Sequence, residues 1–239
     1  MAFPFRLYGH RGAAAHHPEN TMASFRAALE AGADALETDV RLCSDGEVVV
    51  FHDATGERTC ADPRLVRSCD WATVSCWDAG RGERPVRLSD LLAAFPGVFV
   101  NVDLKDDLPE AAERAVAAVR AADASDRVGL GSFHARVARA ARQAGWRGQL
   151  ALTIPEVAAA RLLPGFLARH LVRGDAVQIP VEWKGVRLDR PSFVARCHAL
   201  GLRVDYWTID DPAQAVRLVQ AGADGIVTND PAAIAAALR

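Results

Sequence analysis

At 239 residues, half of them hydrophobic and 24% charged, the chain is long for one ordinary domain and of normal length for a single α/β barrel. The 28 basic and 30 acidic residues give a formal net charge of −2 and form no basic run, so nucleic acid and an anionic membrane surface are not expected as partners. Five cysteines without a CxxC spacing, and no apolar run near the ~20 residues of a membrane span, predict free thiols in a cytoplasmic protein without stable membrane insertion.

Short β-prone stretches alternate with Ala-rich or amphipathic stretches along most of the chain. The predicted strands are Phe5 to Tyr8, Ala35 to Leu42, Glu47 to Phe51, Val98 to Lys105, Val128 to Ser132, Gln149 to Ile154, Ala176 to Pro180, Arg203 to Thr208 and Gly225 to Thr228. The predicted helices are Thr21 to Ala31, Ser89 to Phe95, Pro109 to Ala122, His134 to Ala144, Pro155 to Leu163, Pro191 to Leu200, Pro212 to Ala221 and Pro231 to Leu238.

One segment breaks this alternation. From Ala54 to Arg87 the residues Gly, Pro, Arg, Cys and Trp are mixed, and neither the helical nor the strand period is sustained. The segment is too short to hold a core of its own. We therefore expect one domain over residues 1–239, with residues 54–87 forming an insertion after the second βα region.

A recurring helix end supports a barrel. The sequence Ala31-Gly32-Ala33-Asp34 returns as Ala221-Gly222-Ala223-Asp224, and in both places a predicted helix ends at the glycine and a strand follows. Counting such units gives about eight, which predicts an α/β fold of the (β/α)8 TIM-barrel type. A doubly wound open sheet is the structural alternative. In a barrel, functional groups should lie at the carboxyl ends of the strands.

Carboxylates occupy alternate positions on two predicted strands. Glu37 and Asp39 share one face, and Asn101, Asp103 and Lys105 share the same parity on a later strand. Converging carboxylates repel one another unless a cation lies between them. A lone ExD on a strand is often only a solvated edge. The second strand and the nearby histidines favour a site for one divalent cation, and all-oxygen ligation favours Mg²⁺ or Ca²⁺, with Mn²⁺ also possible.

Two histidines and two cations complete a candidate site. His10 and His52 each end a predicted strand, and a pair of imidazoles can supply an acid and a base in one turnover. Arg11 and Lys105 could hold phosphate oxygens or could simply neutralise the carboxylates. Together with a metal ion, this set suits hydrolysis of an anionic phosphodiester, whose charge must be neutralised and whose leaving group needs a proton.

The ordered motifs resemble the signature of the glycerophosphodiester phosphodiesterase family over nearly the whole chain. They are His10-Arg11-Gly12, Pro18-Glu19-Asn20-Thr21, Glu37-Thr38-Asp39, Asp45-Gly46, His52-Asp53, Asn101-Val102-Asp103-Leu104-Lys105, Ser132-Phe133, Tyr206-Trp207-Thr208 and Asp224-Gly225-Ile226-Val227-Thr228-Asn229-Asp230-Pro231. The resemblance implies a TIM barrel that hydrolyses small-molecule glycerophosphodiesters to glycerol 3-phosphate and an alcohol with Mg²⁺ or Ca²⁺.

The resemblance also implies a role for each candidate residue. The metal ligands would be Glu37, Asp39 and Asp103; the catalytic acid and base would be His10 and His52; the substrate-binding residues would be Arg11, Lys105, Phe133 and Trp207. The insertion matches the place where the family carries a small subdomain beside the mouth.

Two departures from the family pattern concern the site, and a third, Tyr8 before Gly9 where a smaller residue is frequent, is minor. Asp103 stands where Glu is common, and it also matches related sphingomyelinase D and phospholipase D toxins. Asp210 stands near the Trp motif where the family often has Asn, which puts the polar contact at that rim in question.

Three other functions are compatible with parts of the pattern. A lysophospholipase D or sphingomyelinase D would act on lipids and would need an apolar rim, for which the insertion offers only Trp71, Val74 and Trp77. A non-catalytic binding barrel would be expected to lack a histidine or a carboxylate. A metal-dependent proton-abstracting barrel would place its ligands on three successive strands, whereas Glu37 and Asp39 share one strand.

Overall fold

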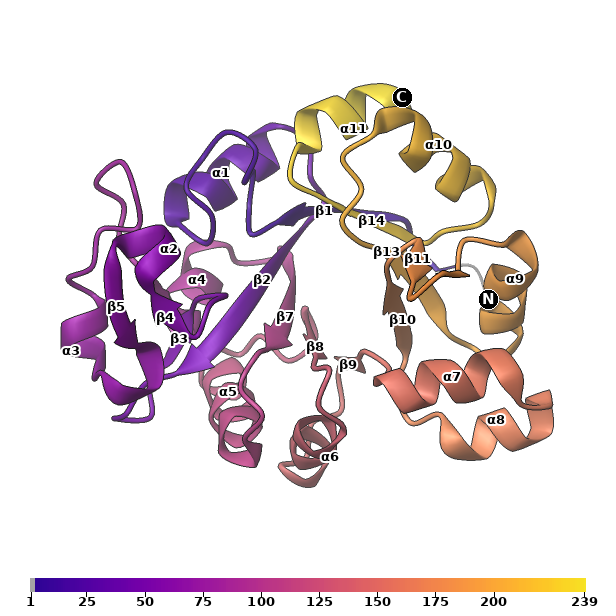
Figure 1. Ribbon diagram of the computed structural model, residues 1–239, viewed down its shortest axis with the longest axis horizontal. Coiled ribbons are helices and arrows are strands. Elements are labelled where there is room, and N and C mark those ends of the chain that lie inside the picture. The colour runs from indigo at the N-terminus through magenta and orange to yellow at the C-terminus, as the bar shows by residue number, and fades with distance from the viewer. Residues whose placement is uncertain (1–2) are drawn as a thin grey trace.

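The computed structural model describes residues 3–239, and within them eight parallel strands form a barrel surrounded by helices (Figure 1). The barrel strands are β1 (Arg6–His10), β2 (Ala35–Leu42), β7 (Phe99–Leu104), β8 (Val128–Gly131), β9 (Gln149–Leu150), β10 (Ala176–Ile179), β13 (Arg203–Tyr206) and β14 (Gly225–Thr228). Hydrogen-bonded neighbours run β10, β13, β14, β1, β2, β7, β8, β9. The ring closes where Leu152 N donates to Ala176 O over 2.8 Å. The predicted (β/α)8 barrel is confirmed.

The outer layer consists of the predicted helices, each within about two residues of its expected bounds, and one further helix. They are α1 (Met22–Glu30), α4 (Leu88–Ala94), α5 (Pro109–Ala121), α6 (Ala135–Gln143), α7 (Ile154–Leu162), α8 (Gly165–Leu171), α9 (Pro191–Ala199), α10 (Pro212–Gln220) and α11 (Pro231–Leu238). The repeated helix end is also observed. Gly32 and Gly222 both have φ of 99°, a left-handed conformation in which a side chain would be strained.

Two hydrophobic clusters fill the space between strands and helices. The larger joins strand residues such as Leu36 and Val100 to Val116 of α5. The other joins Val204 of β13 to Ile234 of α11 on the opposite side of the barrel. Apolar side chains therefore hold the helices onto the outside of the strands.

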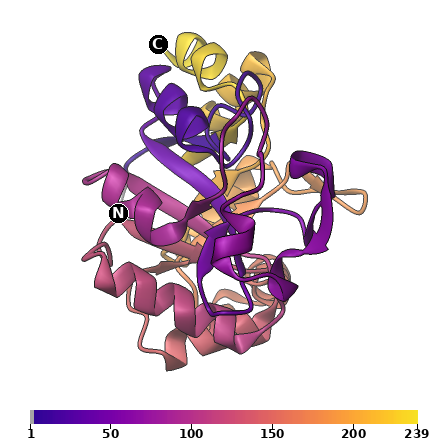
Figure 2. The ribbon, with the colours of Figure 1, turned by 90° about the vertical axis from the view of Figure 1, so that its left-hand side faces the viewer.

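The insertion is built on an antiparallel extension of the sheet. Strand β3 (Val48–Val50) pairs antiparallel with β2 and with β6 (Val86–Arg87). Between them lie β4 (Thr55–Gly56), α2 (Glu57–Cys60), β5 (Asp62–Leu65), the 3₁₀ helix η1 (Val66–Ser68) and α3 (Trp71–Val74), which Figure 2 shows facing the viewer. Val66, Val74 and Trp77 pack against Val49 and Phe51, so the insertion shares a small core with β3.

Three features differ from the predicted elements. Strand β9 ends at Leu150 rather than Ile154, because the side chains of Thr153 and Glu156 form a capping box that starts α7. Helix α8 was not predicted. The loop after β10 forms an unpredicted two-stranded hairpin, β11 (Glu182–Trp183) and β12 (Val186–Arg187). Within residues 3–239, no helix is long and apolar enough to cross a membrane.

Candidate active site

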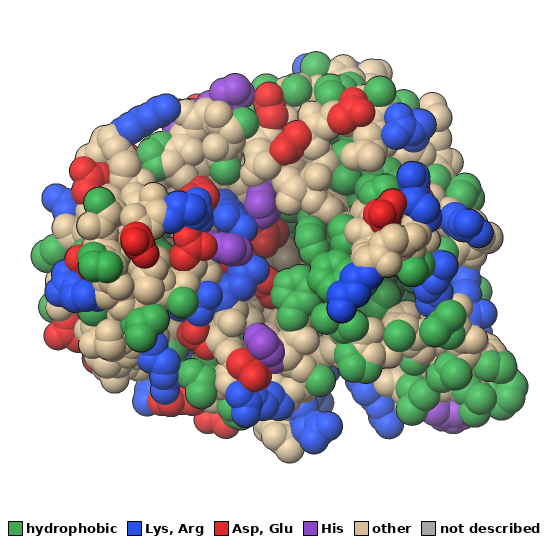
Figure 3. Space-filling model, in the orientation of Figure 1, with side chains coloured by type: hydrophobic (Ala, Val, Ile, Leu, Met, Phe, Trp, Pro, Cys, Tyr) green, Lys and Arg blue, Asp and Glu red, His purple; other side chains and the backbone are tan. Residues whose placement is uncertain are grey.

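A cavity of about 320 Å³ opens at the carboxyl ends of the barrel strands. Figure 3 shows it as a hollow where acidic, basic and histidine side chains meet an apolar wall. All nine residues predicted from the sequence line it: His10, Arg11, Glu37, Asp39, His52, Asp103, Lys105, Phe133 and Trp207. The topology explains most of this convergence, because eight of the nine residues lie on or just after parallel strands whose carboxyl ends meet at one face. His52 is the exception, since it follows the antiparallel strand β3.

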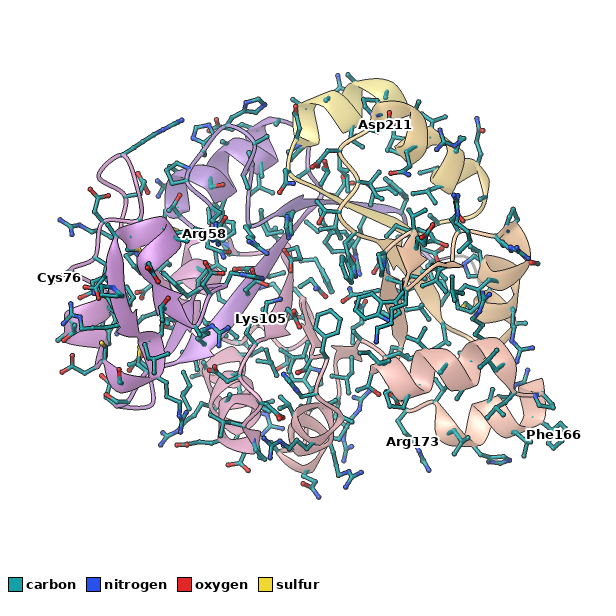
Figure 4. The ribbon with its side chains drawn as sticks, viewed as in Figure 1. Arg58, Cys76, Lys105, Phe166, Arg173 and Asp211 are labelled. Atoms are coloured by element: carbon teal, nitrogen blue, oxygen red, sulfur yellow. The ribbon has the colours of Figure 1, made fainter. Side chains whose placement is uncertain are left out.

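The register of β2 against β7 brings two carboxylates side by side. Asp39 lies opposite Asp103, and Glu37 lies opposite Asn101. Lys105 Nζ lies between the two aspartates, 2.8 Å from Asp39 Oδ1 and 2.6 Å from Asp103 Oδ2 (Figure 4). Burial opposes ionisation of Asp39, but Lys105 and Arg11, whose Nε is 2.8 Å away, hold its pKa below the usual value. Asp39 is therefore an ionised carboxylate with two cationic partners.

Glu37 has no comparable partner. It is 8% exposed, and its nearest polar neighbours are the backbone N of Arg11, which donates over 3.4 Å, and His10 Nε2 at 3.9 Å. Burial, followed by the charge of Asp39, raises the pKa of Glu37 well above its usual value. The site therefore contains a buried carboxylate whose negative charge is poorly compensated.

The donor set suits a divalent cation. Within residues 3–239, no three His, Cys, Asp or Glu side chains are gathered into a ready coordination shell. The ammonium of Lys105 instead stands in for a cation between Asp39 and Asp103. This position favours positive charge, and Glu37 would supply a third oxygen ligand to a hard metal ion.

His10 is held by a neutral amide. Its Nδ1 lies 2.7 Å from Asn229 Oδ1, and Asn229 in turn donates from Nδ2 and from its backbone N to Asp210, each over 2.7 Å. Because the amide NH₂ points at Asp210, its oxygen faces His10, which places the proton on His10 Nδ1 and leaves Nε2 as the acceptor. Burial and the neighbouring charge of Arg11 lower the pKa of His10.

His52 is held by a carboxylate. Its Nδ1 lies 2.6 Å from Asp53 Oδ1, and Arg58 Nε donates to Asp53 Oδ2 over 2.5 Å. Although partial burial opposes it, hydrogen bonds from Arg58 and His52 lower the pKa of Asp53 to about 2. Nδ1 of His52 is thus engaged by an ionised aspartate, and Nε2 is left for the substrate.

Arg58 links the insertion to both sides of the site. Its terminal nitrogens donate to the two oxygens of Glu19 over 2.8 and 2.7 Å, while its Nε contacts Asp53. Glu19 also accepts from Arg11 over 3.0 Å. Sequence reasoning gave no role to Arg58, Glu19, Asp53, Asn229 or Asp210, although all except Arg58 and Asp210 lie in the motifs that carried the resemblance.

The apolar wall of the cavity is aromatic. The rings of Phe133 and Trp207 meet edge to face with centroids 6.0 Å apart, and Lys105 Nζ lies 5.8 Å from the Phe133 ring centroid. A substrate phosphate near Lys105 would therefore place its organic substituent against these rings.

A model of the glycerophosphoryl diester phosphodiesterase family matches residues 10–233. The chain belongs to this family. It is 32% identical over 241 residues to the probable glycerophosphodiester phosphodiesterase 2 of Mycobacterium tuberculosis, covering 94% of this chain and 89% of that protein. It is 29% identical over 237 residues to the glycerophosphodiester phosphodiesterase of Caldanaerobacter subterraneus, covering 94% of each.

A solved structure agrees with this assignment. The crystal structure of a glycerophosphodiester phosphodiesterase from Agrobacterium tumefaciens superimposes with a TM-score of 0.83 at 25% identity, covering 98% of this chain and 99% of that one. Membership of the glycerophosphoryl diester phosphodiesterase family confirms the resemblance and the predicted enzyme class, a phosphodiesterase acting on glycerophosphodiesters.

The departure at Asp210 can now be described structurally. Its carboxylate accepts hydrogen bonds from Thr228 Oγ1 over 2.9 Å and from Asn229, so the polar contact at this rim is present with Asp. Asp210 thus orients the Asn229 amide, whose oxygen contacts His10 Nδ1. The shorter Asp103 pairs directly with Lys105.

Proposed function

We propose that the protein hydrolyses glycerophosphodiesters to sn-glycerol 3-phosphate and an alcohol, using one bound Mg²⁺ or Ca²⁺ ion and acid-base catalysis by His10 and His52. The observation that carries this proposal is the arrangement of the histidines. Each has its Nδ1 engaged by an acceptor, Asn229 or Asp53, and both line the cavity that holds the carboxylates, Arg11 and Lys105.

The divalent cation, held by Glu37, Asp39 and Asp103, would neutralise phosphate charge and make the phosphorus easier to attack. Arg11 and Lys105 add fixed positive charge on either side of Asp39 and bind the remaining phosphate oxygens. Phe133 and Trp207 position the organic substituent and exclude water from that side of the cavity.

His10 acts as the base and His52 as the acid. Burial and Arg11 favour neutral His10, whose Nε2 is then free to take a proton from the nucleophile. His52 is oriented by its Nδ1 contact with Asp53 and donates a proton from Nε2 to the leaving alcohol. The nucleophile is either water or the neighbouring glycerol hydroxyl, and the second route passes through a cyclic phosphate that ³¹P NMR of early time points would detect.

The test is a phosphodiesterase assay on a panel of glycerophosphodiesters with Mg²⁺, Ca²⁺, Mn²⁺ or EDTA. Full activity in EDTA would remove the metal role of Glu37, Asp39 and Asp103. Replacing His10 or His52 by Ala should lower kcat about 10²-fold or more. The matched control is His170→Ala, at an exposed position of α8, which should leave kcat unchanged. Near-normal turnover in both site variants would refute the acid-base roles.

A lipid-directed phosphodiesterase of the lysophospholipase D or sphingomyelinase D kind is the second candidate. The insertion does not supply its apolar rim, because Val74 and Trp77 are buried. However, Phe133, Ile154 and Trp183 are exposed and follow β8, β9 and β10 at the mouth. Faster hydrolysis of lysophosphatidylcholine than of glycerophosphocholine, lost on Trp183→Ala, would favour this candidate.

A further inference from the structure

Helix α8 and the end of α7 expose four large apolar side chains on the outside of the barrel. The exposed fractions are 75% for Leu162, 68% for Phe166, 42% for Leu167 and 54% for Leu171. We call these four residues the α8 patch. Figure 3 shows a contiguous green area at the lower right, and Figure 4 shows Phe166 pointing away from the barrel. Scattered apolar residues are ordinary on surfaces, but a contiguous group of this kind marks an interaction site.

The patch follows from the helical period of α8. Leu167 and Leu171 are four residues apart and lie on one face, while Ala168 turns inward and is fully buried. The inward face thus needs only a small residue, and the large apolar side chains of α8 remain between 42% and 68% exposed within residues 3–239. Core packing does not account for them.

The charged residues within the segment that carries the patch are all basic. Between Val157 and Gly174 the chain contains Arg161, Arg169, His170 and Arg173 but no Asp or Glu. The acidic residues that border this segment are already engaged. Glu156 accepts from Thr153 and from the backbone N of Arg173, and Asp175 accepts from Arg142. Glu156 accepts only from neutral groups and keeps its charge, but the three arginines outnumber it, so the segment around the α8 patch has a net positive charge.

We propose that the α8 patch is a docking surface for an anionic lipid bilayer. Leu162, Phe166 and Leu171 insert at the boundary between headgroups and acyl chains, and Arg169 and Arg173 contact the acidic headgroups. An apolar face rimmed by arginines is the chemistry that such an interface selects. A second copy of the chain fits less well, because a symmetric contact would set the same arginines against one another.

This docking is local and does not depend on the charge of the whole chain. The formal net charge is −2, so long-range attraction to an anionic surface is absent. Binding then relies on a few basic residues within a Debye length of the headgroups together with the inserted side chains. It should therefore be reversible and sensitive to salt.

The experiment is sedimentation of the full chain with vesicles of phosphatidylcholine alone or with about 30 mol% phosphatidylglycerol, at low and at about 0.5 M salt. We expect binding to the anionic vesicles at low salt only. Arg169→Gln/Arg173→Gln should weaken it about 25-fold, the equivalent of about 1 kcal/mol for each arginine. Arg139 and Arg147, exposed arginines elsewhere, provide the matched control variant Arg139→Gln/Arg147→Gln.

A second variant tests the apolar contribution. Phe166→Ser/Leu171→Ser should weaken binding roughly 10-fold or more, whereas Leu65→Ser, at an exposed position of the insertion, should leave it unchanged. Absence of wild-type binding to anionic vesicles at low salt would overturn the proposal. So would wild-type self-association in analytical ultracentrifugation that Phe166→Ser/Leu171→Ser abolishes, because the patch would then be a contact between copies.

Discussion

Replacing Glu37 by Gln should have opposite effects on stability and on cation binding. Glu37 is buried, and no arginine or lysine pairs with it, whereas Asp39 contacts both Arg11 and Lys105. An amide of the same shape removes the buried charge and can still accept from the backbone N of Arg11. The variant should therefore be more stable than the wild type when both are metal-free.

The sign of the pH dependence follows from the direction of the pKa shift. Because the folded-state pKa of Glu37 lies above its unfolded value, the folded state binds more protons. Stability of the metal-free wild type therefore falls as pH rises from about 4.5 through the folded pKa of this group. At pH 8 the free energy of unfolding of Glu37→Gln should exceed that of the metal-free wild type by about 2 kcal/mol, which is the usual effect of removing a poorly paired buried charge. That corresponds to a rise of roughly 4–8 °C in Tm at this chain length.

Calorimetry in EDTA and with added Mg²⁺ or Ca²⁺ measures both effects. A cation at about 100 times its Kd should stabilise the wild type by about 2.7 kcal/mol and should stabilise Glu37→Gln far less. The same substitution at Glu113, an exposed position of α5, is the control. A metal-free variant less stable than the wild type, or one that keeps the full cation effect, would refute the assignment of Glu37.

The remaining predictions concern the framework of the site. Gly12→Ala should lower the free energy of unfolding by about 2–4 kcal/mol in a denaturant titration, because φ is +88° and the new Cβ would lie 2.5 Å from the carbonyl carbon of Ser24. Gly97→Ala should lower it by only about 1 kcal/mol, because φ is also positive, at +82°, but nothing lies within 4 Å of the new Cβ. Arg58→Met should lower kcat more than it changes KM, with partial rescue by Lys, whereas a change in stability without a change in kcat would contradict this role. The folded-state pKa of Asp53 is about 2, so its contribution to stability should be present above about pH 4 and should be lost as pH falls through about 2. Asp53→Asn should remove this pH dependence when unfolding is followed in acid titrations.

The barrel and seven of the nine cavity residues could be predicted from short-range patterns, whereas Phe133 and Trp207 came only from the family resemblance. Residues two apart on a strand share a face, so Glu37 and Asp39 had to project together. Parallel strands end at one face, so His10 and Asp103 had to approach the same mouth, although 93 positions separate them. The number of units came from counting the alternating strands and helices, whose boundaries are marked by helix-ending glycines such as Gly32 and Gly222.

The partners that orient the histidines could not be predicted in the same way. The contact between His10 and Asn229 joins positions 219 apart, and it depends on the register of β1 against β14 and on which way the amide of Asn229 points. No spacing in the sequence contains that information. Asp210 was noticed only because it departs from the resemblance, and the direction of its effect required coordinates.

The elements inside the insertion, and helix α8, escaped prediction for a different reason. The insertion's strands and helices are only two to four residues long, which is too short for a period to be seen. In α8, the exposed Phe166 and Leu171 disguise the face that packs on the barrel, because the inward position is the small Ala168. Sequence patterns identify the core by its apolar residues, so an apolar surface misleads them.

Arg58 gives the insertion a part in the geometry of the site. The two carboxylates that it binds lie in different loops, Glu19 after β1 and Asp53 after β3, and each holds a residue that faces the cavity. Glu19 accepts from Arg11, and Asp53 accepts from His52. A displacement of α2 would therefore shift a phosphate-binding group and an acid-base group together. An arginine suits this position better than a lysine, because its planar fork can satisfy both carboxylates at once.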